Sequence, residues 1–135
     1  MGLLVVDDNP KNAKLLGAIL TPYGECESVE GGKAAILAFE KAWNDWRPFS
    51  FLFLDIMMPE MDGEQVLANI RETEQNKNID DLHRVKIIMV SAHSDEALFN
   101  RCIQSGCDDF IVKPFNKEII IKKLIKHGAN GNLTK

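Results

Sequence analysis

Short apolar runs separated by amphipathic stretches make up most of this 135-residue chain. Runs that are apolar at consecutive positions are typical of strands in a parallel sheet that is buried on both faces. The clearest runs are 3–6, 51–54, 85–90 and 110–112, and residues 25–29 form a weaker candidate. Because a helical pattern follows each run, the sequence predicts one α/β domain with a parallel sheet and helices on both faces.

The stretches between the strands carry helix-start and helix-end signals. Asn9 is a predicted helix cap with Pro10 at the first helical position, and Ser94 and Asn116 are predicted caps of the last two helices. The second helix is expected to end near Trp43 and the third near Thr73. Residues 128–135 are rich in Gly and Asn, so we expect a domain over 1–127 and a flexible C-terminal tail over 128–135.

Charged side chains follow three of the predicted strands. Asp7 and Asp8 follow the first, Asp55 ends the run at 51–54, and Lys113 follows the run at 110–112. The carboxyl ends of parallel strands meet at one edge of a sheet, where ligands bind in open α/β folds. Clustered carboxylates repel one another unless a cation neutralises them, and Mg²⁺ prefers such oxygen ligands. The sequence therefore predicts an acidic pocket that holds Mg²⁺, with Mn²⁺ as a possible substitute.

Four motifs in chain order make this sequence resemble the receiver domains of response regulators. They are Val5-Val6-Asp7-Asp8, Leu54-Asp55-Ile56-Met57-Met58-Pro59-Glu60-Met61-Asp62-Gly63, Ser91-Ala92 and Lys113-Pro114-Phe115. The resemblance covers nearly the whole chain. It implies a flavodoxin-like, CheY-like sheet of strand order 2-1-3-4-5 and phosphorylation of an aspartate.

The resemblance also assigns roles in the pocket. It implies that Asp55 accepts the phosphoryl group and binds the metal together with Asp8 and the main-chain carbonyl of Met57, while Asp7 acts through water. Lys113 would neutralise charge on the phosphoryl oxygens. Such a chain is a signalling phosphoacceptor that catalyses only its own phosphorylation and dephosphorylation, and is not an enzyme in the usual sense.

In the family, a hydroxyl at the Ser91 position binds the phosphoryl group while an aromatic ring at the Phe110 position turns inward. The surface expected to change covers residues 94–127. The Lys113–Pro114 peptide bond is usually cis in this family. Many relatives have Thr and Tyr at these two switch positions, so the Phe110 ring here lacks a hydroxyl. Met57 has no polar side chain to orient water, which predicts slow self-dephosphorylation.

The formal net charge of −4, without any block of like charges, argues against direct binding of nucleic acid or of a membrane. We expect a cytoplasmic protein whose partners are a histidine kinase or a histidine phosphotransfer protein and a downstream protein or a fused effector. It is either a stand-alone regulator or a receiver cut from a hybrid kinase or a longer regulator. A phosphorylation-dependent homodimer is a further possibility.

Two other function classes remain open from the sequence. A haloacid-dehalogenase-like phosphatase also uses a strand-end Asp and Mg²⁺, but it needs a second acid two residues later, where Met57 stands. A phosphorylation-independent interaction domain would normally have lost an acid, the acceptor or the lysine. None of these residues is missing here.

The remaining reactive side chains have ordinary structural interpretations. The three cysteines lack metal-binding spacing and are expected to be reduced and buried; they are Cys26, Cys102 and Cys107. The three histidines are scattered and are expected at the surface; they are His83, His93 and His127. Trp43 and Trp46 are expected to pack at the end of the second helix.

Overall fold

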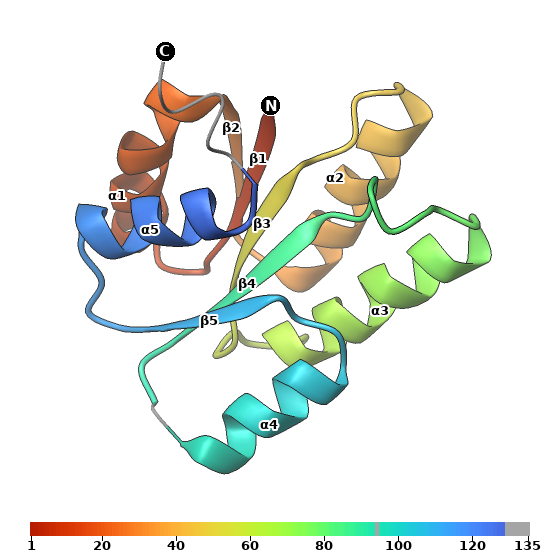
Figure 1. The fold of residues 1–135 in the computed structure, drawn as a ribbon. Helices are drawn as coiled ribbons and strands as arrows, with labels where there is room; N and C mark the ends of the chain where they lie inside the picture. Colours follow the sequence, from red (N-terminus) through yellow and green to blue (C-terminus); the bar gives the residue numbers. More distant parts are fainter. Residues whose placement is uncertain (94, 129–135) are drawn as a thin grey trace.

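Five parallel strands form one sheet in the computed structural model, which describes residues 1–93 and 95–128. The strands are β1 (Gly2–Val6), β2 (Glu25–Val29), β3 (Phe51–Asp55), β4 (Lys86–Ser91) and β5 (Asp109–Val112). Their order is β2-β1-β3-β4-β5, with β2 and β5 at the edges (Figure 1). The predicted α/β architecture and strand order are confirmed.

Helices cover both faces of the sheet (Figure 1). They are α1 (Pro10–Leu20), α2 (Gly32–Asn44), α3 (Gly63–Asn76), α4 (Glu96–Gln104) and α5 (Lys117–Lys126), with a short 3-10 turn η1 (Thr21–Tyr23) after α1. Helices α1 and α5 lie on one face, and α2, α3 and α4 lie on the other. None of the helices in the described residues is long and apolar enough to cross a membrane.

The core has two halves because successive strand residues point to opposite faces of the sheet. Leu3 and Val5 pack with the α1 and α5 side, whereas Leu4 and Val6 pack with the α2, α3 and α4 side. All four side chains are buried. Burial on both faces explains why the inner strands β1, β3 and β4 carry consecutive apolar residues, whereas the edge strand β2 is largely polar and exposed.

The predicted N-terminal caps can be compared with the structure at the starts of three helices. The Asn9 side chain accepts hydrogen bonds from the first turn of α1, and Asn116 accepts one from Ile119 N in α5, so both predicted caps are confirmed. The prediction for α4 was wrong: its cap is Asp95, whose carboxylate accepts from Ala97 N. Ser94 itself lies outside the described residues.

The cysteines fit the expectation of reduced thiols, although one is less buried than expected. All three are free; Cys102 and Cys107 are buried, while Cys26 is only half-buried. Burial raises the pKa of Cys102 to about 11 and that of Cys107 to about 12. These two thiols therefore carry little thiolate near neutral pH, as a structural role requires.

A buried ion network fastens α3 to the amino-terminal edge of the sheet. The Arg71 guanidinium donates to Glu74 Oε1 at 2.6 Å and to Asp108 Oδ2 at 2.8 Å, and also to the carbonyls of Val85 and Gly106. Glu74 is fully buried, and its other oxygen accepts from Val85 N at 2.8 Å. The network joins α3, the start of β4 and the turn before β5. Sequence reasoning missed this network, because Val85, Gly106 and Asp108 are far from Arg71 along the chain.

A second buried acid, Asp109, holds the last turn of α5 against β5. Its carboxylate accepts from Lys123 Nζ and contacts His127 Nε2, each at 2.8 Å, and Lys126 Nζ lies 3.5 Å away. His127 is therefore mostly buried, and the prediction of a surface histidine was wrong there. Ile120 and Leu124 are the buried residues of α5, and the polar contacts with Asp109 add to their attachment of the helix.

We predict that Asp109→Asn lowers the free energy of unfolding by about 2 kcal/mol at neutral pH. Burial raises the pKa of Asp109, but hydrogen bonds from Lys123, His127 and the Phe110 N–H outweigh it and hold the pKa at about 2. A lowered folded-state pKa stabilises the fold above the unfolded value of 3.8, and this stabilisation is lost as the pH falls toward 2.

Urea denaturation of both proteins at neutral pH and near pH 3 measures the effect. The difference between wild type and Asp109→Asn should shrink to roughly half at the lower pH. Asp81→Asn is the control, because Asp81 is almost fully exposed and should show little effect at either pH. A difference that does not change with pH would contradict the assignment.

Candidate functional site

The carboxyl ends of β1, β3, β4 and β5 bring the predicted residues together. Parallel pairing sets Val6 beside Leu54, Asp55 beside Val90 and Ser91 beside Val112. The acids after β1, the acid at the end of β3, the hydroxyl at the end of β4 and the lysine after β5 therefore lie at one edge of the sheet. This is the edge at which open α/β sheets bind ligands.

Three carboxylates form a tight cluster at this edge. Asp7, Asp8 and Asp55 each offer an oxygen, and these atoms all lie within 4.8 Å of one another. Asp7 and Asp55 are both only 4% exposed, whereas Asp8 is open to solvent. Burial, and then the charge of Asp7, raise the pKa of Asp55 to about 6, although Lys113 acts in the opposite direction. The cluster is thus short of positive charge.

Lys113 supplies the only positive charge that contacts these acids in the described part of the chain. Its Nζ lies 3.4 Å from Asp7 Oδ2 and 3.4 Å from Asp55 Oδ1. The lysine side chain is mostly buried, so its ammonium is held in the pocket and not in bulk water. One ammonium leaves three carboxylates undercompensated, and such a set of hard oxygen donors fits a divalent cation such as Mg²⁺.

Local main-chain geometry fixes the two buried acids. Asn9 N donates to Asp7 Oδ1 at 2.9 Å, and Met57 N donates to Asp55 Oδ1 at 3.3 Å. Gly63 packs so closely under the end of β3 that a Cβ atom there would lie 2.8 Å from the Ile56 Cα. Position 63 therefore needs glycine, because any side chain would displace the strand end that carries Asp55.

Asp62 has a structural role that sequence reasoning missed. It caps α3 and forms a reciprocal capping box with Gln65. Asp62 Oδ1 accepts from Gln65 N at 2.9 Å, and Gln65 Oε1 accepts from Asp62 N at 3.0 Å. The Asp-x-x-Gln spacing before an apolar helix was the available signal.

The two predicted switch residues lie on neighbouring strands. Ser91 is fully buried, and its Oγ accepts from His93 N at 3.0 Å, which leaves the hydroxyl proton available to donate elsewhere. Phe110 is half-buried against Phe99 of α4, with ring centroids 5.5 Å apart in an edge-on arrangement. The Lys113–Pro114 peptide bond is cis, as the resemblance implies.

Comparison with known proteins identifies the family of this chain. The family model described as the response regulator receiver domain matches residues 3–126. The chain belongs to the response regulator receiver domain family. The chain is thus a receiver domain of two-component signalling, and its sheet has the strand order of that family.

The similar proteins extend this result. Hybrid signal transduction histidine kinase L of Dictyostelium discoideum is 39% identical over 96% of this chain, and sensor protein GacS of Pseudomonas syringae pv. syringae is 34% identical over 92%. This chain spans only 7% and 13% of their lengths. The CheX–CheY–BeF3–Mg²⁺ complex from Borrelia burgdorferi contains a chain 28% identical to this one, with a TM-score of 0.80 and coverage of 93% of this chain and 87% of that one.

We predict that Mg²⁺ stabilises the folded receiver domain through the acid cluster. At a concentration ten times its dissociation constant, the ion should add about 1.4 kcal/mol to the free energy of unfolding. Asp8→Asn should remove most of this gain because Asp8 provides the solvent-facing oxygen of the cluster. The gain should also shrink below about pH 6, where Asp55 takes up a proton.

Thermal unfolding with and without Mg²⁺ measures these gains. Asp45→Asn, which removes an exposed acid on another part of the molecule, should keep the full effect. Equal Mg²⁺ stabilisation of wild type and Asp8→Asn would contradict the assignment of the cluster.

Proposed function

We propose that this receiver domain accepts a phosphoryl group on Asp55 from a phosphohistidine of a histidine kinase or a histidine phosphotransfer protein. The observation that supports this most is the buried Asp55 carboxylate, with Lys113 Nζ at 3.4 Å and two further acids beside it. A nucleophilic carboxylate with one ammonium and a cation-binding acid pair has the parts that phosphoryl transfer needs.

In this reaction, an Asp55 carboxylate oxygen attacks the phosphorus atom of the phosphohistidine. The bond between phosphorus and the imidazole nitrogen breaks, and the donor histidine leaves with the electron pair. Lys113 lies where its ammonium offsets the negative charge of the phosphoryl oxygens. Asp55 must be ionised to attack, so its raised pKa makes a neighbouring cation more important.

Asp8, Asp55 and the main-chain carbonyl of Met57 would hold Mg²⁺, with Asp7 acting through water; Mn²⁺ is a possible substitute. When bound, the ion supplies positive charge that shields the attacking carboxylate from the phosphoryl oxygens. The role of Asn9 N and Met57 N is to keep the two buried carboxylates oriented before a donor arrives.

Phosphorylation would then change the conformation of the domain through Ser91 and Phe110. The Ser91 hydroxyl can donate to a phosphoryl oxygen on Asp55, and Phe110 would move inward from its contact with Phe99. A phosphoryl group that contacts Ser91 in one conformer shifts the population of the domain toward that conformer. The surface affected would include exposed apolar side chains of α4, β5 and α5, among them Phe99, Ile103, Val112 and Ile119.

A downstream protein or a fused effector would bind that surface, and a phosphorylation-dependent homodimer could use it as well. The similarity to hybrid kinases fits a receiver that works as part of a longer protein, and a stand-alone regulator in the cytoplasm is the other form. The phosphatase alternative gains no support, because Met57 stands where a second acid is needed and its side chain is apolar.

We predict that acetyl phosphate adds one phosphoryl group to the wild-type chain only when Mg²⁺ is present. Asp55→Asn should gain none, and Lys113→Met should gain it at least about ten-fold more slowly because the phosphoryl charge is then less neutralised. Intact-mass measurement follows the gain. Asp62→Asn is the control, because its amide keeps a cap oxygen for α3 and leaves the acid cluster intact.

Absence of any mass gain in the wild type would contradict phosphoryl acceptance. It would leave a phosphorylation-independent interaction domain as the better description, and unaltered partner binding by Asp55→Asn would support that description.

We predict that Met57→Asn speeds hydrolysis of the aspartyl phosphate by about ten-fold, because an amide can orient the attacking water and a thioether cannot. The Met57 side chain is 59% exposed beside Asp55, so the new amide would face both solvent and the acceptor. The decay of the phosphorylated form, followed by mass, measures the rate. Glu60→Asn puts the same amide elsewhere in this loop and should leave the rate unchanged. Equal decay of wild type and Met57→Asn would show the idea to be wrong.

A further inference from the structure

Met57 is a methionine that the fold leaves in solvent. It is 59% exposed, whereas Met58 is 9% and Met89 is 0% exposed. Met1 and Met61 are partly buried, each packed against one half of the core, and all five methionines of the chain lie in its described part. An apolar side chain that stays in solvent adds little to the stability of the core. A dissolved oxidant can therefore reach the Met57 thioether more easily than the thioethers of the other methionines.

Main-chain contacts keep Met57 close to the phosphoacceptor. Met57 N donates to Asp55 Oδ1 at 3.3 Å, so the side chain of residue 57 leaves the main chain next to the acceptor carboxylate. The loop that follows is anchored where Gly63 N donates to the carbonyl of Ile56 at 2.9 Å. A chemical change of the Met57 side chain therefore takes place beside Asp55 and in contact with solvent.

A peroxide converts an exposed thioether to a sulfoxide. A lone pair of the Met57 sulfur attacks one oxygen of hydrogen peroxide, and the S–O bond forms while the O–O bond breaks. The departing hydroxide takes up the proton of the transferred oxygen and leaves as water, so sulfur is oxidised and the peroxide is reduced. The product is a polar side chain whose oxygen is a hydrogen-bond acceptor.

The sulfoxide changes how residue 57 interacts with water beside Asp55. A thioether cannot orient water, but a sulfoxide oxygen can accept a hydrogen bond from it. We propose that oxidation of Met57 by peroxide is a modification that shortens the lifetime of the phosphoryl group on Asp55. The oriented water attacks phosphorus, the bond to the Asp55 oxygen breaks, and the protons of the water leave with inorganic phosphate. This inference rests on the proposed phosphoryl acceptance by Asp55.

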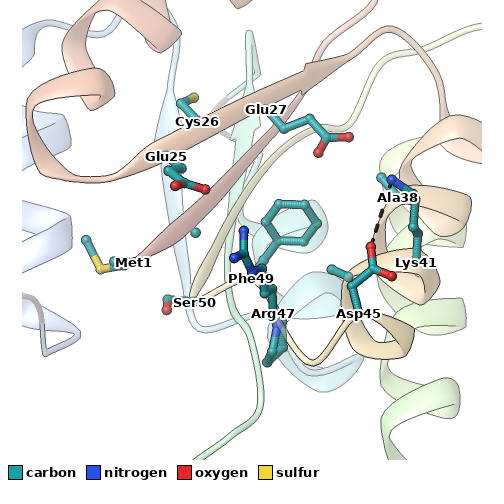
Figure 2. Close-up of a pocket in the computed structure, with 13 residues that line it drawn as sticks. Met1, Glu25, Cys26, Glu27, Ala38, Lys41, Asp45, Arg47, Phe49 and Ser50 are labelled. Carbon is teal, nitrogen blue, oxygen red and sulfur yellow. Dashed lines mark ion pairs between the residues drawn. The ribbon is translucent and has the colours of Figure 1, made fainter.

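Cys26 is a second oxidisable side chain, but it lies at the other edge of the sheet. It is half-buried and lines a cavity of about 730 Å³ formed by the starts of β1 and β2, the last turns of α2 and the segment that leads into β3 (Figure 2). Burial raises the pKa of the Cys26 thiol, which slows its oxidation because the thiolate is the reactive form.

Trp46 is another side chain that an oxidant can reach. It is 85% exposed, so the expectation that it packs at the end of α2 was wrong, whereas Trp43 does pack against the core. Trp46 follows α2 between Asp45 and Arg47, which line the same cavity as Cys26 (Figure 2). Oxidation of Trp46 or Cys26 therefore alters the amino-terminal edge of the sheet, opposite the acid cluster.

The first measurement maps the modification. Wild type is treated briefly with dilute hydrogen peroxide, the reaction is stopped with catalase, and peptide mass spectrometry locates the added oxygen. Sulfoxide should form at Met57 before it forms at the other internal methionines. Oxidation of Met57 that is no faster than oxidation of the buried Met89 would overturn the inference.

The second measurement follows the decay of the aspartyl phosphate. The chain is oxidised, freed of peroxide with catalase, phosphorylated with acetyl phosphate and Mg²⁺, and desalted, and intact mass then gives the decay rate. The oxidised chain should lose its phosphoryl group roughly three- to ten-fold faster than the untreated chain. Treatment with a methionine sulfoxide reductase before phosphorylation should restore the slow decay, because the enzyme reverses sulfoxide formation.

Variants separate Met57 from the other oxidisable side chains. Met57→Leu has no thioether at this position, so peroxide should not change its own decay rate. Met57→Gln carries an amide oxygen in place of the sulfoxide oxygen and should decay equally fast before and after peroxide. Two controls should respond to peroxide as wild type does: Met61→Leu, which replaces a partly buried methionine of the same loop, and Cys26→Ser.

The outcomes distinguish this inference from the proposed function. A wild-type chain that accepts no phosphoryl group would overturn the proposed function and this inference with it. A phosphorylated chain that decays at the same rate with and without the Met57 sulfoxide would overturn this inference alone. Peroxide that speeds the decay of Met57→Leu as much as that of wild type would do the same.

Discussion

Repulsion between buried carboxylates at the carboxyl edge of the sheet is the constraint on which the rest of this structure depends. Asp7 and Asp55 are held together because β1 and β3 are neighbours, and the strands cannot separate without opening the core on both faces. Lys113 offsets part of the repulsion from the end of β5. The site therefore needs positive charge beyond that of Lys113.

The stability of the core makes this arrangement possible. Every residue of β3 is buried, and the helix that follows begins at Gly63, packed directly beneath the end of that strand. Part of the free energy gained by burying the core thus offsets the repulsion between these like charges. A binding site built this way responds to small changes of charge, because the acids are already close and already oriented by main-chain N–H groups.

The elements that sequence reasoning predicted well are those governed by local chemistry. Consecutive apolar residues identified the strands, and Asn9 and Asn116 identified two helix starts. Contacts between distant residues were not predictable in this way. The partners of Arg71 are spread over residues 74–108. The contact between Asp109 and His127 depends on how α5 packs against β5. The roles of Asp55 and Lys113 came from the resemblance as well as from the strand pattern, since an isolated charge at a strand end has many ordinary explanations.

The ion network around Arg71 has a mechanical consequence. It joins α3 to the start of β4 and to the turn before β5, at the edge of the sheet opposite the acid cluster. Two adjacent strands are therefore clamped at the same end, while their other ends carry Ser91 and Lys113. The network therefore restrains both strands at the ends farthest from the acid cluster.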